Sequence, residues 1–159
     1  MQVRPARLDE AGEVARQYAR MAEEGWIAGQ PPIDLEERTA RFRASIEAGT
    51  TFVLEVDGRL VGHGGVNETH AKGVVTCGMA VMPEARGTGG GRALLEHIVE
   101  YAREQGCHKV ELEVWTDNAP AIGLYATSGF EVEGLKRDHY RRKDGSLRSA
   151  LLMARRLSD

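Results

Sequence analysis

The sequence has little cysteine, no long hydrophobic run and no excess of positive charge. Its 159 residues include only two cysteines, so a disulfide framework is excluded, and no Cys/His cluster has zinc-site spacing. The net charge of −3 argues against a nucleic-acid-binding domain. No segment approaches the ~20 apolar residues that span a bilayer, and the first residues lack the apolar core of a signal peptide. We therefore expect a soluble, cytoplasmic chain with one domain over residues 1–159 and no membrane partner.

What the sequence does contain is an alternation of strand and helix patterns. Hydrophobic residues make up 42% and charged residues 28%, as in globular domains. Asp57-Gly58 between β-rich runs predicts a hairpin, and residues 109–115 alternate cleanly between apolar and polar side chains. The pattern predicts a mixed α/β domain around one sheet. Strands are expected at 3–7, 51–56, 59–61, 73–82, 109–115, from Phe130 and at 149–157, and helices from Asp9 or Glu10 to about Trp26, from Asp34 to Gly49, at 89–105 and from Asn118 to Gly129.

A glycine-rich stretch joins the strand expected at 73–82 to the helix expected at 89–105. Free N–H groups and the dipole at a helix N-terminus attract anions, and glycines remove the Cβ atoms that would keep a phosphate from the backbone. A dinucleotide-binding fingerprint counted from Gly87 would place Arg92 at its third glycine, and the Lys-Ser/Thr pair of a P-loop is missing. The stretch therefore predicts a phosphate-binding loop of another kind.

Two segments resemble the motifs of the GNAT superfamily of N-acetyltransferases. Arg86-x-x-Gly89-x-Gly91, between a strand and a helix, is similar to that family's pyrophosphate-binding motif. Segment 118–130, an Asn-led helix with a Tyr before a closing Gly-Phe, looks like its second signature. The order of expected elements matches over most of the chain. The resemblance implies an acyl-CoA N-acyltransferase-like fold, with a single mixed, mostly antiparallel central sheet flanked by helices, and acetyl-CoA as cosubstrate with no metal.

The resemblance also implies which residues bind the cofactor. The backbone of the glycine loop would hold the pyrophosphate, the strand edge before it the pantetheine arm, and a backbone N–H near Val81 the oxyanion of a tetrahedral intermediate. Asn118 would contact the cofactor, although a plain helix cap accounts for it equally well. The implied cofactor-binding residues are Met79, Ala80, Val81, Arg86, Gly87, Thr88, Gly89, Gly90, Gly91, Arg92 and Asn118.

Tyr125 is the implied catalytic residue, a general acid that protonates the departing CoA thiolate. A phenol of pKa near 10 gives its proton to a thiolate of pKa near 8.5 at a cost of roughly 2 kcal/mol, which a positioned site can offset. The alternative is that Tyr125 is only a core aromatic on a short helix.

The sequence does not identify the general base. An alkyl amine of pKa near 10.4 is deprotonated at pH 7 at a cost of roughly 4–5 kcal/mol, so a base or a chain of waters is expected. Many members of the family supply a Glu on the strand before the glycine loop, but residues 76–81 carry no carboxylate. Cys77 is expected to be a small buried hydrophobe, so direct attack without an acyl-enzyme is expected. The candidates for the base are Glu113, Glu68, His70, Glu24 and water.

The acceptor is expected to be an amine of a small, amino-acid-like molecule or, as in the ribosomal-protein branch of the family, a protein N-terminus. The carboxylates and Trp near the end of the first helix could suit an ammonium group, and the basic segment after Gly134 an anionic cofactor or a carboxylate-bearing acceptor. Two other functions stay open: a catalytically idle CoA-binding regulatory module, and a domain that binds ATP on the glycine loop. A homodimer is compatible with the sequence, which does not determine the oligomeric state.

Overall fold

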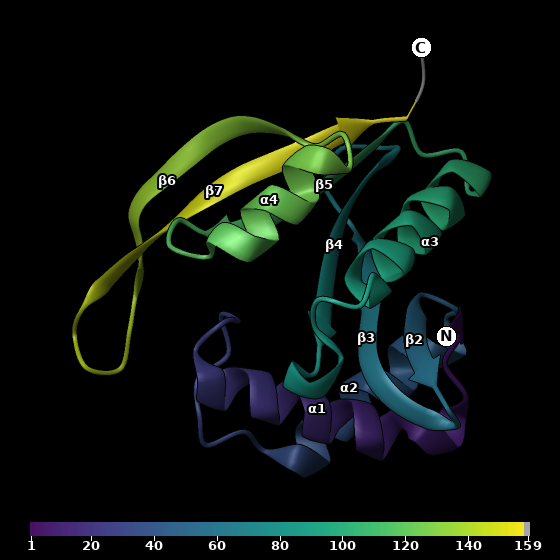
Figure 1. Cartoon of the computed structure of the whole chain (residues 1–159). Coiled ribbons are helices and arrows are strands. Elements are labelled where there is room, and N and C mark those ends of the chain that lie inside the picture. The colour runs from purple at the N-terminus through teal and green to yellow at the C-terminus, as the bar shows by residue number, and fades with distance from the viewer. Residues whose placement is uncertain (158–159) are drawn as a thin grey trace. The chain divides into compact units, whose positions relative to one another are not determined.

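In the computed structural model, which describes residues 1–157, helices flank a mixed seven-stranded sheet (Figure 1). The strand order is β1-β2-β3-β4-β5-β7-β6, with β4 and β5 parallel and β1–β2, β2–β3, β5–β7 and β6–β7 antiparallel. This confirms the expected fold class. The chain divides into two compact units, one of Met1–Asn67 with Gly78–Ile98, the other of Glu68–Cys77 with Val99–Asp159.

The first unit holds the N-terminal strands and helices and the passage from strand β4 into helix α3. α1 and α2 lie side by side in it (Figure 1). Asp34 caps α2 as its sequence predicts, because its Oδ1 accepts the Glu37 N–H at 3.0 Å. Asp57 and Gly58 take φ values of 50° and 75°, as the expected hairpin turn requires. The elements are β1 (Gln2–Pro5), η1 (Leu8–Glu10), α1 (Ala11–Glu24), α2 (Leu35–Glu47), β2 (Thr51–Val56), β3 (Arg59–Glu68), β4 (Val74–Val81), η2 (Pro83–Ala85) and α3 (Gly90–Glu104).

Strand β3 is longer than the sequence pattern indicates. The expected strand at 59–61 stops at a run of glycines, which normally weaken a strand. In the structure these glycines allow β3 to approach its neighbours: a Cβ on Gly62 would lie 2.9 Å from the Ala80 carbonyl oxygen, and one on Gly64 would lie 2.8 Å from Ile98 Cδ1. The strand therefore continues through these glycines, which the sequence pattern indicates as its end, because close packing against the neighbouring elements requires them.

A buried histidine sits at the contact between α1 and β3. The Gln17 side chain donates to the Leu60 carbonyl at 2.9 Å, so its Oε1 is left to accept from His63 Nδ1 at 3.1 Å. The Phe42 ring packs edge-on against the imidazole at 5.4 Å between ring centres. Burial lowers the pKa of His63 to about 4, so the ring is neutral at pH 7.

The neutral His63 makes the stability of the fold depend on pH. Its pKa in the unfolded chain is near 6.5, so unfolding takes up a proton between about pH 6.5 and pH 4 and the free energy of unfolding falls as the pH drops through that range. We expect the wild type to lose roughly 2–3 kcal/mol more than a His63→Asn variant, which keeps an N–H donor for Gln17, between pH 7.5 and 4.5. Urea unfolding at the two pH values measures this, and equal losses in both proteins would contradict it.

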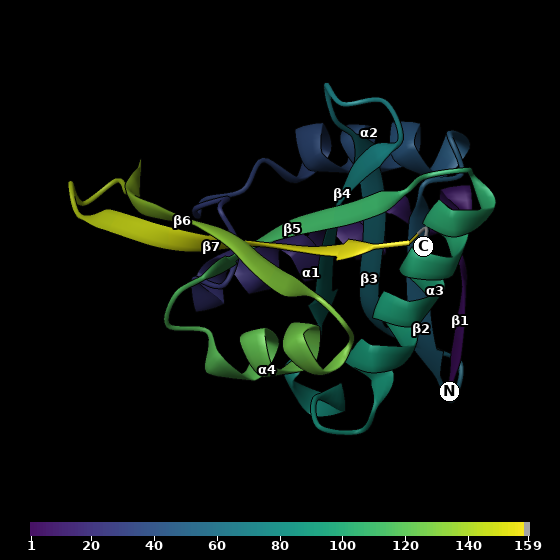
Figure 2. The same cartoon turned by 90° about the horizontal axis from the view of Figure 1, so that it is seen from above.

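The second unit holds the C-terminal half of the sheet. Its elements are the start of β4, the end of α3, β5 (Lys109–Trp115), α4 (Ala119–Thr127), β6 (Glu131–Arg141) and β7 (Leu147–Arg156). β5 has the expected bounds, and its Val110, Leu112 and Val114 are buried as their alternation predicts. Helix α4 lies along one face of β5, β7 and β6 (Figure 2). Among the residues described, no helix is long and apolar enough to cross a membrane.

Candidate active site

The passage from β4 into α3 is an exposed loop built on a short 3₁₀ turn. Pro83 ends the strand and begins η2, in which the Ala85 N–H bonds to the Met82 carbonyl at 2.9 Å. The Thr88 hydroxyl then donates to the Ala85 carbonyl at 2.7 Å and holds the loop against that turn. Arg86 to Gly89 are all exposed. The chain thus leaves the strand and enters the helix through a loop with a fixed path and an accessible backbone.

The glycines of this loop have two different roles. Gly87 and Gly89 have φ values of 75° and 88°, and a Cβ at either position would meet nothing within 4 Å, so they supply a left-handed backbone and leave the space above it open. Gly90 is buried, and a Cβ there would lie 2.6 Å from Leu54 Cδ2. Gly90 therefore lets the helix start close against strand β2, while Gly87 and Gly89 leave room for a ligand.

Helix α3 begins where this loop ends. Its first hydrogen bond to the loop joins the Ala93 N–H to the Gly89 carbonyl at 3.0 Å, and the N–H groups ahead of that bond belong to the class that a helix leaves without an intrahelical acceptor. Together with the positive end of the helix dipole, such groups favour an anion. The open glycine backbone and the helix start fit a pyrophosphate.

The strand before the loop presents alternate backbone groups to its two edges. The Gly78 and Ala80 carbonyls lie towards β3, and the Met82 N–H bonds to the Val61 carbonyl at 2.8 Å. Alternation therefore turns the backbone of Met79 and Val81 to the opposite edge. This is the edge at which the resemblance to the acetyltransferases predicts the pantetheine arm.

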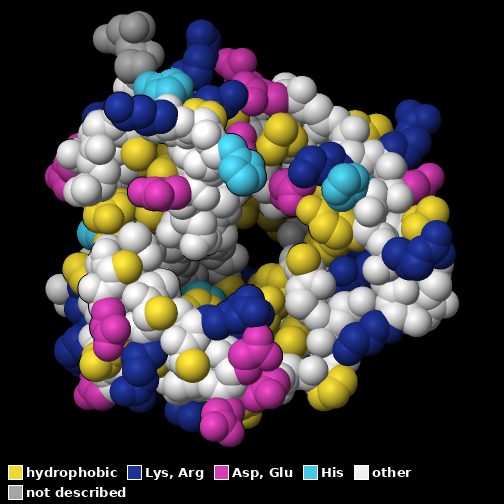
Figure 3. Space-filling view, turned by 180° about the vertical axis from the view of Figure 1, so that it is seen from behind, with side chains coloured by type: hydrophobic (Ala, Val, Ile, Leu, Met, Phe, Trp, Pro, Cys, Tyr) yellow, Lys and Arg dark blue, Asp and Glu magenta, His cyan; other side chains and the backbone are white. Residues whose placement is uncertain are grey.

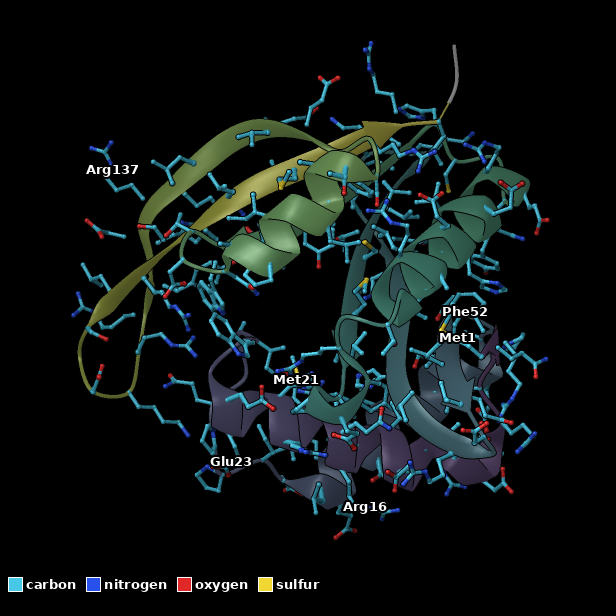
Figure 4. All side chains as sticks on the ribbon, in the orientation of Figure 1. Met1, Arg16, Met21, Glu23, Phe52 and Arg137 are labelled. Atoms are coloured by element: carbon cyan, nitrogen blue, oxygen red, sulfur yellow. The ribbon has the colours of Figure 1, made fainter. Side chains whose placement is uncertain are left out.

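Arg86 is held by neighbours that lie far from it in the sequence as well as by the preceding strand. Its Nε donates to the Val81 carbonyl at 2.9 Å, and its Nη2 pairs with Glu24 Oε2 at 2.8 Å at the end of α1. The same nitrogen lies 3.3 Å from the sulfur of Met21, whose side chain lies beside the η2 segment (Figure 4). In this structure the guanidinium fixes the start of the loop, and the Glu24 carboxylate, a candidate base, is engaged in an ion pair.

Tyr125 lies on α4 in the second unit, and Asn118 is the N-cap residue of that helix. The Asn118 Oδ1 accepts the Ala121 N–H at 3.3 Å, so the structure gives this residue its helix-capping role. The Tyr125 ring is tilted against Phe130, with 5.9 Å between ring centres. Burial first, and then the neighbouring Cys77, raise the pKa of the Tyr125 phenol. Tyr125 therefore carries its proton at neutral pH, and the same shift makes its phenol a weaker acid than that of a free tyrosine.

Cys77 and Glu113 are poorly suited to act as a nucleophile and as a general base, respectively. Burial raises the pKa of the Cys77 thiol to about 12, which leaves it protonated and weakly nucleophilic. The Glu113 carboxylate accepts from the Tyr140 hydroxyl and pairs with the Lys136 ammonium. Although partial burial acts to raise the pKa of Glu113, these partners hold it below the ordinary value, so it is a weak base. Glu68 and His70 are exposed.

Known proteins of one family are similar in sequence to this chain. Residues 15–130 match the acetyltransferase (GNAT) family. The L-methionine sulfoximine/L-methionine sulfone acetyltransferase of Pseudomonas paraeruginosa is 32% identical over 114 residues, which are 68% of this chain and just under two thirds (66%) of that protein.

Solved structures extend the likeness over the whole fold. Ribosomal-protein-alanine N-acetyltransferase from Brucella melitensis superimposes with a TM-score of 0.90 and 26% identity, covering 99% of this chain and all of that one. The Salmonella typhimurium protein YncA, solved with its cofactor acetyl-CoA, does so with a TM-score of 0.89 and 24% identity, covering 100% of this chain and 95% of that one. The family match spans most of the chain and includes the loop before α3. The chain belongs to the GNAT acetyltransferase family.

Proposed function

We propose that this protein transfers the acetyl group of acetyl-CoA to the primary amine of a small, amino-acid-like acceptor by direct attack in a ternary complex. The observation that carries the proposal is the exposed loop from Arg86 to Gly89, whose two left-handed glycines leave open space ahead of α3. A bulky side chain is absent where a diphosphate would need to touch the backbone. The relative that acts on L-methionine sulfoximine and L-methionine sulfone supports an amino-acid-like acceptor.

Two parts of this region would contact the cofactor: the loop before α3 and the free edge of strand β4. Backbone N–H groups of Gly87 to Gly91 would bind the pyrophosphate, and Arg86 would act by holding the loop through the Val81 carbonyl and Glu24. The backbone of Met79 and Val81, on the edge of β4 that faces away from β3, would hydrogen-bond the pantetheine arm. A backbone N–H at this edge would also stabilise the oxyanion.

The protons need one acid and one base. The amine nitrogen attacks the thioester carbonyl carbon, the tetrahedral intermediate collapses with cleavage of the C–S bond, and the Tyr125 hydroxyl protonates the leaving sulfur. The amine proton passes to water, because Glu24 and Glu113 are both tied to cations and Cys77 stays a thiol. Solvent then reprotonates Tyr125, which its raised pKa favours.

An acceptor screen tests the proposal. The purified protein is mixed with acetyl-CoA and a panel of amino acids, simple amines and peptides with free N-termini, and release of free CoA thiol is followed with a thiol reagent. Amine-dependent thiol release with small molecules is the expected result. Release with peptides alone would replace the acceptor by a protein N-terminus; the Brucella melitensis structure is named a ribosomal-protein-alanine N-acetyltransferase.

Thermal-shift measurements on the same protein distinguish the two remaining functions. A thermal shift with CoA but no thiol release on any amine would identify a CoA-binding module without catalysis. A thermal shift with ATP and none with CoA would identify a nucleotide-binding domain and overturn the proposal. Both measurements use the full chain.

A further inference from the structure

Arg86 binds one backbone carbonyl on the free edge of strand β4. The Met82 N–H donates to the Val61 carbonyl at 2.8 Å. The Val81 carbonyl, in the same peptide group, accepts from Arg86 Nε at 2.9 Å. Because a trans peptide group is planar, these two bonds point in opposite directions, the first towards β3 and the second away from it. The guanidinium therefore occupies the hydrogen-bond acceptor that Val81 presents at this edge.

The N–H of Val81 is left as the hydrogen-bonding group at this position. In a strand, the N–H and the carbonyl of one residue lie towards the same edge, so the Val81 N–H also faces away from β3. The registered pairs between β4 and β5 run from Val74 to Thr76, and Val81 lies beyond the last of them. A ligand that reaches this edge at Val81 thus meets a donor beside a carbonyl that is already bonded.

Two side chains of helix α1 fix the guanidinium in this place. Arg86 Nη2 pairs with Glu24 Oε2 at 2.8 Å and lies 3.3 Å from the sulfur of Met21. The Glu24 side chain is 24% exposed and Met21 is buried. Together with the bond from Nε to the Val81 carbonyl, these contacts hold the planar guanidinium at two of its nitrogens, which sets its orientation as well as its position. All of these residues belong to the first compact unit.

An ion pair by itself is common on this protein. Acidic and basic side chains are interspersed over the face shown in Figure 3, and exposed pairs contribute little to stability. A second pair joins the same two elements, because Arg20 on α1 binds Glu84 of η2 at 3.1 Å, with both side chains about half exposed. Of these two pairs, the one with Arg86 is bonded to the β4 backbone. It is therefore this pair that can affect what the edge of β4 binds.

The arrangement at Val81 matches a thioester better than an amide. A peptide-like segment that pairs with a strand residue accepts from its N–H and also donates to its carbonyl, but the Val81 carbonyl is already bonded to Arg86. A thioester offers only an acceptor, which suits the Val81 N–H. When the amine attacks, the electron pair of the thioester C=O bond moves to oxygen, and a fixed donor beside a fixed positive charge stabilises that oxyanion.

We infer that Arg86, oriented by Glu24, is a positioning residue that acts through Val81: it fixes the thioester carbonyl of acetyl-CoA at the Val81 N–H and does not bind the diphosphate. This inference rests on the proposed function. The loop that would hold the diphosphate keeps its path through another bond, from the Thr88 hydroxyl to the Ala85 carbonyl at 2.7 Å. Loss of the guanidinium is therefore expected to affect the acetyl end of the cofactor more than its phosphate end.

Infrared difference spectra of bound acetyl-CoA test the inference without an acceptor. Acetyl-CoA with an isotope label at its thioester carbonyl carbon is compared in the wild type and in Arg86→Met, which keeps a straight side chain and removes the charge and the donors. The carbonyl band should lie at lower frequency in the wild type, because a hydrogen bond and a nearby positive charge weaken the C=O bond. Calorimetry should give values of Kd for CoA that differ by less than about threefold. An equal band position in the two proteins, or a Kd for CoA raised about tenfold or more in Arg86→Met, would overturn the inference.

Steady-state kinetics with an acceptor from the screen tests the role of Glu24. Arg86→Met should lower kcat about 20-fold, which is less than the loss of a direct oxyanion donor costs, with the KM for acetyl-CoA changed less than about threefold. Glu24→Ala should lower kcat about fivefold and should have no further effect in the Arg86→Met background, because Glu24 acts through the arginine. A further loss of kcat in the double variant would contradict that role.

Arg20→Gln is the matched control, since it breaks the other ion pair between α1 and η2 and leaves the bond from Arg86 to the β4 backbone in place. Equal losses of kcat in Arg20→Gln and Glu24→Ala would assign both pairs to the packing of α1 and overturn the inference. The carbonyl band separates the inference from the proposed function. A band shift that depends on Arg86, without transfer to any amine, keeps the thioester site and rejects the transferase, whereas transfer with an unchanged band does the reverse.

Discussion

Replacement of Tyr125 by phenylalanine is expected to lower kcat for thiol release by about 100-fold or more, the range in which general acids contribute. The variant keeps the ring that packs against Phe130 and removes only the hydroxyl. The free energy of unfolding and the KM for acetyl-CoA should therefore stay close to those of the wild type. Steady-state kinetics with any acceptor from the screen measures the change.

The pH profile gives a second readout of the same residue. Burial raises the pKa of Tyr125, so its hydroxyl is still protonated when the acceptor amine, of pKa near 10.4, becomes neutral. The wild-type rate should rise with pH towards 10 without a decline caused by this phenol. A lowered pKa of Tyr125 would have the opposite effect, because the phenol would lose its proton at a lower pH and the rate would stop rising there.

Tyr101→Phe is the control, since it removes one phenol from α3, outside the proposed site. A Tyr125→Phe variant with kcat equal to that of Tyr101→Phe would assign Tyr125 to the core alone. The leaving thiolate would then take its proton from water. That result would leave the acetyl-CoA site and the transfer reaction in place.

The local features of the site could be predicted from the sequence because each is encoded in a few neighbouring residues. Asn118 caps the next helix through an amide three residues on, as Asp34 does for α2. The motif from Arg86 to Gly91 places glycines where the backbone turns left-handed before α3. In such segments the side chain, the turn and the helix start lie within one short stretch of chain.

The partners of the charged groups could not be predicted in this way. Arg86 pairs with Glu24 across 62 residues of sequence, and Glu113 binds Tyr140 across 27. Both carboxylates stood among the candidates for the general base, and the cation that each of them faces in the fold lies far away in the sequence. The contact of Arg148 with Trp115, in which the Arg148 Cζ lies 4.3 Å from the ring centre, likewise depends on the register of β5 against β7.

A Gly89→Glu substitution is expected to weaken binding of CoA at least 100-fold, which corresponds to about 2.7 kcal/mol of binding free energy. The new carboxylate would stand in the open space above the loop, where a Cβ meets nothing within 4 Å, and would repel the diphosphate that the helix start attracts. Calorimetric titration of CoA measures the loss, which should diminish at high salt because the repulsion is screened.

Gly58→Glu separates the electrostatic effect from backbone strain. Gly58 has a φ of 75° against 88° for Gly89, and a Cβ there also meets nothing within 4 Å, but it lies in the β2–β3 turn and not before a helix. Both variants should lose roughly 1–2 kcal/mol of stability because a side chain is forced into the left-handed region. Only Gly89→Glu should lose CoA. If both variants bind CoA as tightly as the wild type, the pyrophosphate does not rest on this loop, and the assignment of the residues from Arg86 to Arg92 to the cofactor must be abandoned.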